Sequence, residues 1–337
     1  MQPSAILDLH FNPAPGKQDI CAAVSSTATL ALFRLTPGET EPLKHLKTMG
    51  MASMCKTNED GLEDKDEIIF THFAWHPTKP DMVAVTTTVG SVHLIYLGDD
   101  VGGGGGSDWV MHPEPILTHT LEAWFVSISP SPSPPGQAEE DDSFLLMSGG
   151  DDSALRYTLC KRTRADADEA EESPYAIEVL RPPVSVRGHE AGVTAILPLG
   201  LKDGESELVV TGSYDDHIRL FSIPAYGFGR AVELASSNLG GGVWRLKVVK
   251  EERGLFEEGQ GWRLTMLVSC MHAGARVVEL LKRGAGEYEF RVIGRFEEHK
   301  SMNYGSDCQL SAEGTLSVVS TSFYDKLLCL WKFEIGC

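Results

Sequence analysis

The sequence predicts an all-β protein, a β-propeller assembled from repeated antiparallel sheets. Three observations support this: a repeated pattern of short strands, tight turns of small residues between them, and almost no helical periodicity. The clearest copies of the repeat end at Tyr157, Phe221 and Trp331. Weaker copies end at Phe33, at Tyr96 and near Leu280, which makes six visible blades. No Gly-x-Gly-x-x-Gly or phosphate-loop lysine occurs, so we exclude a nucleotide-binding α/β fold.

Small residues mark the turn between the second and third strands of each clear copy, where they let two strands reverse tightly. Aligned on the final aromatic residue, the copies place Asp151, Asp215 and Asp325 at one turn position. Gly188-His189 precedes the fourth copy, at the place of the Gly-His pair of WD-repeat proteins, which the chain resembles. The resemblance implies a buried, hydrogen-bonded structural set formed by His189, Asp215, Ser213 and Phe221.

Composition and charge limit the classes of function. Of the 337 residues, 42% are apolar and 23% are charged, which is ordinary for a soluble protein. Acidic residues number 48 and basic residues 29, for a formal charge of −19. This sign disfavours a nucleic-acid partner and suits a cationic one, although part of the charge lies in loop sequence such as 166–172. No apolar run approaches the roughly 20 residues of a membrane helix, and no signal-peptide pattern is present.

The seven cysteines are widely scattered and form no Cys-x-x-Cys pair; they are Cys21, Cys55, Cys160, Cys270, Cys308, Cys329 and Cys337. This pattern predicts reduced thiols in a cytosolic or nuclear compartment. We therefore expect a cytoplasmic protein with no metal site and no cofactor.

We expect a single propeller domain over residues 1–337, with inserted loops near 99–108, 129–142 and 163–173 that are rich in Gly, Ser-Pro and acidic residues. WD propellers most often close with seven blades. This chain opens with a first strand at 5–11 and ends after a third strand at 325–333. We therefore expect the first blade and the closing strand to be missing, with a wedge-shaped gap between those two segments. A six-bladed ring with irregular closure is the alternative.

Several unusual segments fall where the loops of a propeller meet around its central channel, the usual place for a ligand in this architecture. They are Glu122-Ala123-Trp124, Tyr214-Asp215-Asp216-His217, Gly240-Gly241-Gly242-Val243-Trp244-Arg245, Cys270-Met271-His272, Tyr304-Gly305-Ser306-Asp307 and Ser322-Phe323-Tyr324-Asp325. The same series, in the same order, is found in the diphthine methyl ester hydrolase family, which the chain resembles over roughly residues 4 to 333. Cys308 stands where that family tends to have Trp, which puts the inner wall of that blade in doubt.

The resemblance implies a carboxylic-ester hydrolase that removes a methyl ester from methylated diphthine on translation elongation factor two. That factor would be the partner, with no nucleic acid and no membrane involved. The substrate arm carries a trimethylammonium group, which aromatic rings hold by cation–π contacts worth about 0.5–2 kcal/mol each. We assign substrate binding to Glu122, Trp124, Tyr214, Asp216, His217, Trp244, Arg245, Tyr304 and Tyr324. The alternative for each ring is packing between blades.

Ester hydrolysis needs a nucleophile or an activated water, a base and an oxyanion donor, and the sequence has no Gly-x-Ser-x-Gly elbow. We name His272 as candidate base, and Asp307 as the group that orients it or itself activates water. Cys270 is a candidate nucleophile, on the same strand face as His272 if that strand is regular. Arg245 or the amides of 240–242 are candidate oxyanion donors. The alternative function is a non-catalytic scaffold or peptide-binding adaptor.

Overall fold

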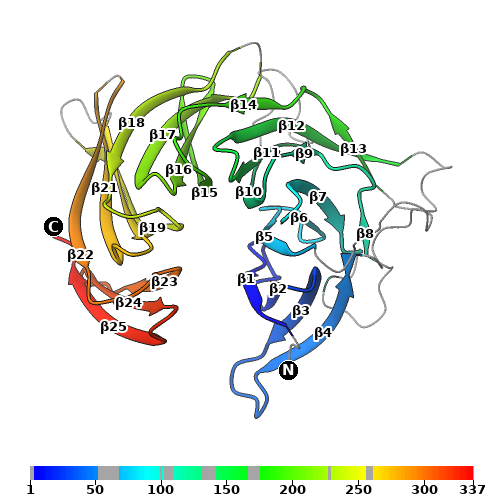
Figure 1. Cartoon of the computed structure of the whole chain (residues 1–337), viewed down its shortest axis with the longest axis horizontal. Helices are drawn as coiled ribbons and strands as arrows, with labels where there is room; N and C mark the ends of the chain where they lie inside the picture. The colour runs from blue at the N-terminus through cyan, green and yellow to red at the C-terminus, as the bar shows by residue number, and fades with distance from the viewer. Residues whose placement is uncertain are drawn as a thin grey trace. The chain divides into compact units, whose positions relative to one another are not determined.

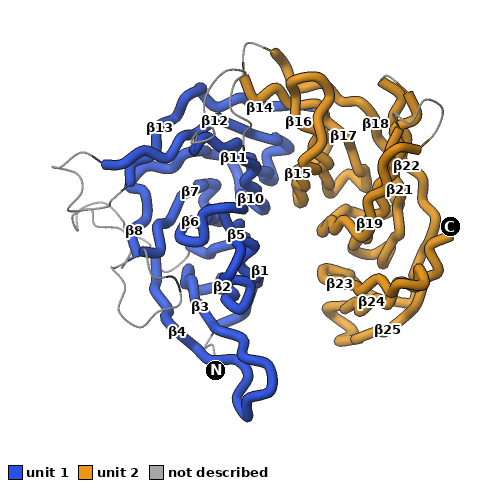
Figure 2. Tube along the Cα trace, turned by 180° about the vertical axis from the view of Figure 1, so that it is seen from behind, with its two compact units in different colours: residues 1–187 blue, residues 188–337 orange. Residues whose placement is uncertain are grey.

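The computed structural model describes residues 4–51, 68–98, 101, 109–130, 142–165, 175–226, 229–255, 261–284 and 286–336. Contacts divide the chain into two compact units, residues 1–187 (unit 1) and residues 188–337 (unit 2) (Figure 2). The elements run as β-strands from β1 to β25, which confirms the predicted all-β class (Figure 1). Within the described ranges, no helix has the length and apolar character needed to cross a membrane.

Unit 1 contains three antiparallel sheets. The first has the order β1 (Ile6–Phe11), β2 (Ile20–Ser25), β3 (Thr29–Leu35) and β4 (Leu43–Gly50). The second has the order β5 (Phe70–Trp75), β6 (Met82–Thr87), β7 (Ser91–Tyr96) and β8 (Val110–Met111), with β9 (Leu117–Thr118) also paired to β7. The third has the order β10 (Ala123–Pro130), β11 (Ser143–Gly150), β12 (Leu155–Arg164) and β13 (Tyr175–Val179), with β14 (Val184–Val186) also paired to β12.

Unit 2 contains three further antiparallel sheets. The fourth sheet has the order β15 (Val193–Asp203), β16 (Ser206–Ser213), β17 (His217–Pro224) and β18 (Val232–Asn238). The fifth has the order β19 (Arg245–Leu255), β20 (Gly261–Ser269), β21 (Ala275–Gly284) and β22 (Glu287–Phe296). The sixth has three strands, β23 (Gly305–Leu310), β24 (Thr315–Ser322) and β25 (Leu327–Glu334). Apart from β9 and β14, which pair with the third strand of their sheets, successive strands are neighbours in all six sheets, as in the blades of a propeller.

The second strand of a sheet is the most deeply buried. Every residue of β2, β6 and β11 is buried, and their sequences are nearly continuous runs of apolar and small residues. A strand has such a continuous apolar sequence when both faces of its sheet are covered, because neither face then needs polar side chains. The fourth strands β4 and β18 are instead largely exposed. The second strands β2, β6 and β11 are therefore covered on both faces, whereas the outer strands β4 and β18 border solvent.

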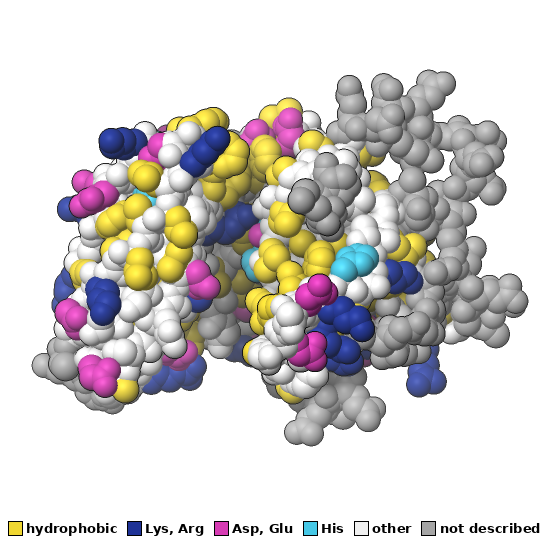
Figure 3. Space-filling view, turned by 90° about the horizontal axis from the view of Figure 1, so that it is seen from below, with side chains coloured by type: hydrophobic (Ala, Val, Ile, Leu, Met, Phe, Trp, Pro, Cys, Tyr) yellow, Lys and Arg dark blue, Asp and Glu magenta, His cyan; other side chains and the backbone are white. Residues whose placement is uncertain are grey.

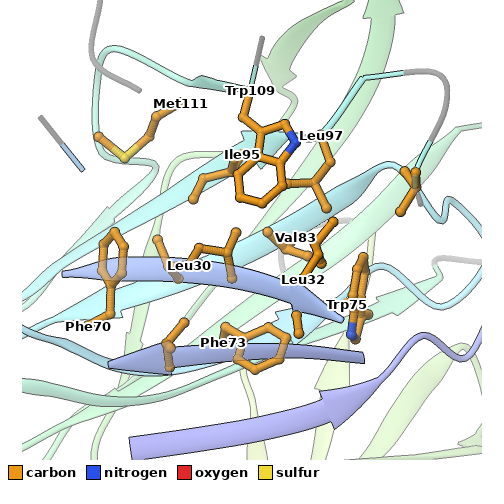
Figure 4. Close-up of a cluster of buried hydrophobic side chains, with 14 of the residues drawn as sticks. Leu30, Leu32, Phe70, Phe73, Trp75, Val83, Ile95, Leu97, Trp109 and Met111 are labelled. Atoms are coloured by element: carbon orange, nitrogen blue, oxygen red, sulfur yellow. The ribbon is translucent and has the colours of Figure 1, made fainter. Parts of the chain in front are cut away.

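Apolar side chains of neighbouring sheets form the cores. Between the first and second sheets, Leu30 and Leu32 of β3 pack with Phe70, Phe73 and Val83 (Figure 4). A second core in unit 1 joins the second and third sheets. In unit 2, one core joins the fourth and fifth sheets and another joins the fifth and sixth. Burial of each large side chain contributes about 1.5–3 kcal/mol, so the packing of sheet on sheet is what stabilises each unit.

The six predicted repeats correspond to the six sheets. Each predicted end falls in the third strand of a sheet, at Phe33, Tyr96, Tyr157, Phe221, Leu280 and Trp331. As expected, the sixth sheet has no fourth strand among the described residues. Residues 5–11 and 325–333 belong to different units, so the predicted gap between them stays a prediction.

The predicted loops fall largely outside the described residues, which omit 99–100, 102–108, 131–141 and 166–174, as well as Cys55 and Cys337. The boundaries of two loops were wrong, because residues 129–130 end β10 and residues 163–164 end β12. Backbone pairing continues there despite the loop-like composition: Pro130 pairs with Phe144, and Arg164 pairs with Tyr175.

Edge strands of two sheets expose apolar side chains. Leu328 and Leu330 of β25 are each 72% exposed, and Ile6 and Leu9 of β1 are 52% and 44% exposed. Figure 3 shows apolar side chains lying beside charged ones on one face of the molecule. An apolar edge strand is a template for pairing with another chain, so these two strands are the surfaces most prone to association.

Candidate functional site

Three sheets carry a histidine that bonds a hydroxyl group on the neighbouring second strand. His119 Nε2 lies 2.8 Å from Ser148 Oγ, and His189 Nε2 lies 2.8 Å from Thr211 Oγ1. In the sixth sheet, His299 Nε2 lies 2.8 Å from Ser320 Oγ. The partner expected for His189 was wrong: Ser213 Oγ donates to the carbonyl of Ala191 instead, at 3.0 Å. The ring of Phe221 lies 5.4 Å from the His189 ring, as the predicted set requires.

The turn aspartates accept the backbone N–H that follows each histidine. Asp215 accepts from Glu190 N–H, and Asp152 accepts from Thr120 N–H. Asp152 is therefore the counterpart of Asp215, and the alignment that placed Asp151 there was wrong by one residue. The alignment failed because Tyr157 and Phe221 do not hold equivalent positions. The histidine-bonding residues Ser148 and Thr211 pair with Arg156 and Arg219, and Tyr157 follows Arg156 by one residue whereas Phe221 follows Arg219 by two.

The protonation states of His189 and Asp215 suit a structural role. Burial lowers the pKa of His189 to about 4, so the imidazole is neutral at physiological pH. Burial alone would raise the pKa of Asp215, but hydrogen bonds from Arg219 and from two backbone amides lower it to about 2. An ionised carboxylate that accepts several hydrogen bonds and a neutral imidazole bonded through Nε2 hold the turn in place.

Five aromatic side chains of unit 2 form a continuous cluster, the aromatic cluster, which consists of Tyr214, Trp244, Tyr304, Phe323 and Tyr324. The Trp244 ring lies 5.8 Å from Tyr214 and 5.0 Å from Tyr304. The Phe323 ring lies 5.9 Å from Tyr304 and 5.1 Å from Tyr324. Phe323 was not predicted as a site residue, although it lies beside Tyr324 in one of the motifs. Phe323 and Tyr324 are 65% and 71% exposed, so this end of the cluster is open to solvent.

Backbone hydrogen bonds fix the segments that carry these rings. The N–H of Val243 donates to Ser213 at 2.9 Å, and the N–H of Trp244 donates to Ser269 at 2.8 Å. The N–H of Asn303 donates to Met271 at 2.9 Å. Starts of first strands and turns between second and third strands thus meet at one end of the fourth, fifth and sixth sheets. The sequence predicted this convergence for Tyr214, Trp244, Tyr304 and Tyr324, and these rings do come together.

The glycine-rich segment before β19 is needed for this close approach. A Cβ on Gly241 would lie 2.5 Å from the carbonyl oxygen of Cys270 and 2.7 Å from the Cβ of Ala273. A Cβ on Gly242 would lie 2.7 Å from the sulfur of Met271. Because real Cβ atoms do not approach so closely, only glycine lets the segment pass against the turn after β20 and deliver Trp244 to the cluster.

Charged residues flank the aromatic cluster. The guanidinium of Arg245 lies 5.4 Å from the ring centroid of Trp244, and its Nη1 donates to the Trp244 carbonyl at 3.1 Å. Asp216 and His217 follow Tyr214 in the same turn, where Asp216 has a positive φ of 67°. Nδ1 of His217 bonds the carbonyl of Asp215 at 2.7 Å. Asp216, His217 and Arg245 thus lie in the segments that carry Tyr214 and Trp244.

The candidate catalytic residues do not form the expected arrangement. Cys270 and His272 do not share a strand face, because β20 ends at Ser269 and both lie in the turn that follows. Cys270 is fully buried, and burial raises the pKa of its thiol to about 12, which disfavours the nucleophilic thiolate. His272 is exposed. Asp307, whose side chain is 77% exposed, pairs with Lys247, and no hydrogen bond or ion pair joins it to His272 in the part of the chain described.

Glu122 and Trp124 belong to unit 1, whereas the other predicted binding residues belong to unit 2. Nε1 of Trp124 donates to Asp151 at 2.7 Å, and the carbonyl of Glu122 accepts the N–H of Asp151 at 2.9 Å. Asp151 therefore orients Trp124, which explains why this turn carries two successive aspartates: Asp152 bonds the structural histidine, and Asp151 bonds the indole.

One group of potential metal ligands was not predicted. Asp8, His10 and His72 of unit 1 bring their ligand atoms within 4.8 Å of one another. The sequence carried no signal for it, because His72 lies in the next sheet and only sheet packing brings it to Asp8.

The chain is similar to diphthine methyltransferases. It is 31% identical to that of Schizosaccharomyces pombe over 217 residues, 64% of this chain and 52% of the relative. It is 29% identical to that of Saccharomyces cerevisiae over 243 residues, 67% of this chain and 54% of the relative. A homolog from Dictyostelium discoideum is 21% identical over 333 residues, 97% of this chain and 76% of that protein. The chain spans about half the length of the first two relatives.

No protein-family model matches the chain. Among solved structures, Chaetomium thermophilum Sqt1 bound to the N-terminus of ribosomal protein L10 is similar with a TM-score of 0.57 at 14% identity, over 99% of this chain and 73% of that one. A chain of the mitotic checkpoint complex has a TM-score of 0.54 at 12% identity, over 99% of this chain and 79% of that one. These likenesses confirm the fold as a WD40 β-propeller, with six blades in the part of the chain that the structure describes.

Proposed function

We propose that this protein is a carboxylic-ester hydrolase of diphthamide biosynthesis. Its substrate is methylated diphthine on translation elongation factor two, and the reaction takes place in the cytoplasm. The proposal is supported by the similarity to diphthine methyltransferases and by the ordered series of loop motifs. The name of those relatives denotes methyl transfer, whereas in the proposed reaction water cleaves the methyl ester and the methyl group leaves as methanol.

The observation that carries the proposal is the aromatic cluster. Trp244 lies between Tyr214 and Tyr304, with ring centroids 5.8 Å and 5.0 Å away, at the end of the sheets where loops from three blades meet. Rings arranged in this way bind a trimethylammonium group through their electron-rich faces, each contact worth about 0.5–2 kcal/mol. Burial and the nearby Tyr324 raise the pKa of Tyr304, so its phenol stays neutral at physiological pH.

Charge around the aromatic cluster suits the two ends of the substrate. Asp216 and the net charge of −19 favour the cationic end of the arm. Arg245 places a guanidinium against Trp244, where it can stabilise a developing oxyanion or the carboxylate product. We retain His272 as a candidate base and the amides of 240–242 as further oxyanion donors. Cys270 is left out because its thiol is buried and protonated.

Release of methanol from elongation factor two carrying methyl-esterified diphthine tests the proposal with the whole chain. We expect turnover by the unaltered protein and at least a fivefold higher KM for Trp244→Leu, from the loss of about 1 kcal/mol of cation–π energy. Tyr288→Leu is the matched control: it removes a ring paired with Trp262 at 6.0 Å, outside the aromatic cluster. We expect it to keep the original KM.

His272 is exposed and has no carboxylate partner among the described residues, and this observation favours a second candidate function. A non-catalytic adaptor would bind the modified factor through the same rings and release no methanol. The unaltered protein would then bind the modified factor without turnover, and Trp244→Leu would weaken this binding. That result would favour the adaptor over the hydrolase.

A further inference from the structure

Three side chains of unit 1 converge from two neighbouring sheets. Asp8 and His10 lie on the same face of β1, in a stretch that pairs regularly with β2, and His72 lies on β5. Strands β1 and β5 are side by side in both backbone views (Figures 1 and 2). One carboxylate oxygen and two imidazole nitrogens thus come within 4.8 Å of one another, and no second group of this kind occurs among the described residues.

The distances within this group are close to those of a metal site. Oδ2 of Asp8 lies 2.8 Å from Nε2 of His10 and 3.1 Å from Nε2 of His72. Around a tetrahedral zinc ion, ligand atoms lie about 3.3 Å apart, because Zn–N and Zn–O distances are about 2.0–2.1 Å. The two imidazole rings are 5.5 Å apart at their centroids, with an angle of 67° between their planes. Small outward shifts of the side chains would therefore admit an ion.

Burial holds two of these side chains in place and leaves the third accessible. The side chains of Asp8 and His72 are 6% and 3% exposed, whereas that of His10 is 44% exposed. The His72 ring is stacked on Phe125 at 3.8 Å, and the Phe73 ring lies 5.3 Å from that of His10. Two buried ligands behind a half-exposed one give an ion a largely preformed site with an entry path from solvent.

The chemistry of the donor atoms selects the kind of ion. Imidazole nitrogen suits zinc and other first-row transition metals, whereas calcium and magnesium prefer oxygen ligands. Asp8 adds a negative charge in a buried position, where a cation stabilises it. Two imidazoles and one carboxylate fill three positions of a tetrahedron, and the fourth is left for water.

We propose that Asp8, His10 and His72 bind a divalent transition-metal ion, for which zinc is the best match, with water as the fourth ligand. The ion joins β1, the edge strand of the first sheet, to β5 of the second sheet. This site replaces the expectation from the sequence that the protein has no metal site. It goes beyond the proposed function, because the aromatic cluster that carries that function lies in unit 2.

One contact limits the affinity of the site. Nδ1 of His72 accepts the N–H of Val126 at 3.3 Å. An ion on Nε2 moves the ring proton to Nδ1, so this contact is lost on binding. Loss of one buried hydrogen bond weakens binding by roughly 5- to 150-fold. We therefore expect a dissociation constant in the micromolar range, weaker than that of a structural zinc site with four protein ligands.

Calorimetric titration of the whole chain with Zn²⁺, after removal of metal by EDTA, tests the site. We expect one ion per chain in the unaltered protein and at least a tenfold higher Kd in His10→Gln, whose half-exposed position leaves the core intact. His45→Gln, at an exposed histidine of unit 1 that bonds Thr48, is the matched control and should keep Kd within twofold. Equal Kd values in His10→Gln and the unaltered protein, or no binding by the unaltered protein at millimolar Zn²⁺, would overturn the site.

Co²⁺ in place of Zn²⁺ reports the ligands directly. We expect the visible absorption bands of four-coordinate cobalt in the unaltered protein and in His45→Gln, and their loss in His10→Gln. A near-ultraviolet band from a thiolate ligand would place the ion on a cysteine and reject the site.

Thermal unfolding gives a third measurement. Because an ion that binds only the folded protein stabilises it, saturating Zn²⁺ should raise the thermal midpoint of the unaltered protein and of His45→Gln. The midpoint of His10→Gln should not change, and an equal rise in all three proteins would contradict the assignment. None of these measurements uses an ester, so their outcome is independent of the proposed function.

Discussion

Replacing Asp215 by asparagine removes the charge at the centre of a buried network in the fourth sheet. Its carboxylate binds the guanidinium of Arg219 at 2.8 Å and 2.9 Å and accepts the N–H of Glu190 at 2.8 Å. The side chains of Asp215 and Arg219 are 5% and 7% exposed. Only Glu233, at 3.5 Å, remains among the described residues to compensate Arg219. Because removing one partner leaves a buried charge uncompensated, we expect the free energy of unfolding to fall by about 3–5 kcal/mol.

Urea unfolding at pH 7, followed by circular dichroism, measures this loss. Asp307→Asn is the matched control, since it makes the same chemical change in an ion pair with Lys247 whose aspartate side chain is 77% exposed. An exposed pair contributes little, so we expect a change within about 0.5 kcal/mol. Equal losses of stability in the two variants would refute the idea that burial makes the Asp215 network strong.

Three further predictions concern acid, the glycine segment and a thiol. Hydrogen bonds hold the pKa values of Asp152 and Asp215 at about 2 in the folded protein, below the usual 3.8, so the stability they contribute is present above about pH 4 and is lost as the pH falls towards 2. The thermal midpoint should drop through that window, and less steeply in Asp215→Asn; an unchanged slope would contradict the assignment. Gly241→Ala should weaken binding of tetramethylammonium, measured by tryptophan fluorescence, because the new Cβ would lie 2.5 Å from the carbonyl oxygen of Cys270; Gly284→Ala, whose Cβ meets nothing nearer than 3.6 Å, should bind as before. Cys270 should resist iodoacetamide in the folded protein, because burial raises its pKa to about 12, while the partly exposed Cys329 reacts first; rapid labelling of Cys270 in mass spectra would show that its turn opens.

Local sequence determined the blades. Strand patterns and small turn residues act between neighbours in the chain, so the pattern of residues alone located the six repeats and their third strands. The order of the loop motifs likewise predicted that Tyr214, Trp244, Tyr304 and Tyr324 would meet. The starts of first strands and the second-to-third turns lie on the same side of an antiparallel blade, and this follows from strand order alone.

Tertiary structure decided which groups are partners and which are buried. Strand register decides that His189 bonds Thr211 and that Asp152 is the counterpart of Asp215. A register shift of one residue would move each side chain to the other face of the sheet. That Cys270 is buried while His272 is exposed depends on the path of the turn after β20 against a glycine segment. The contact of Asp8 with His72 arises only when one sheet packs on another. Such contacts join residues far apart in the chain, and no local pattern encodes them.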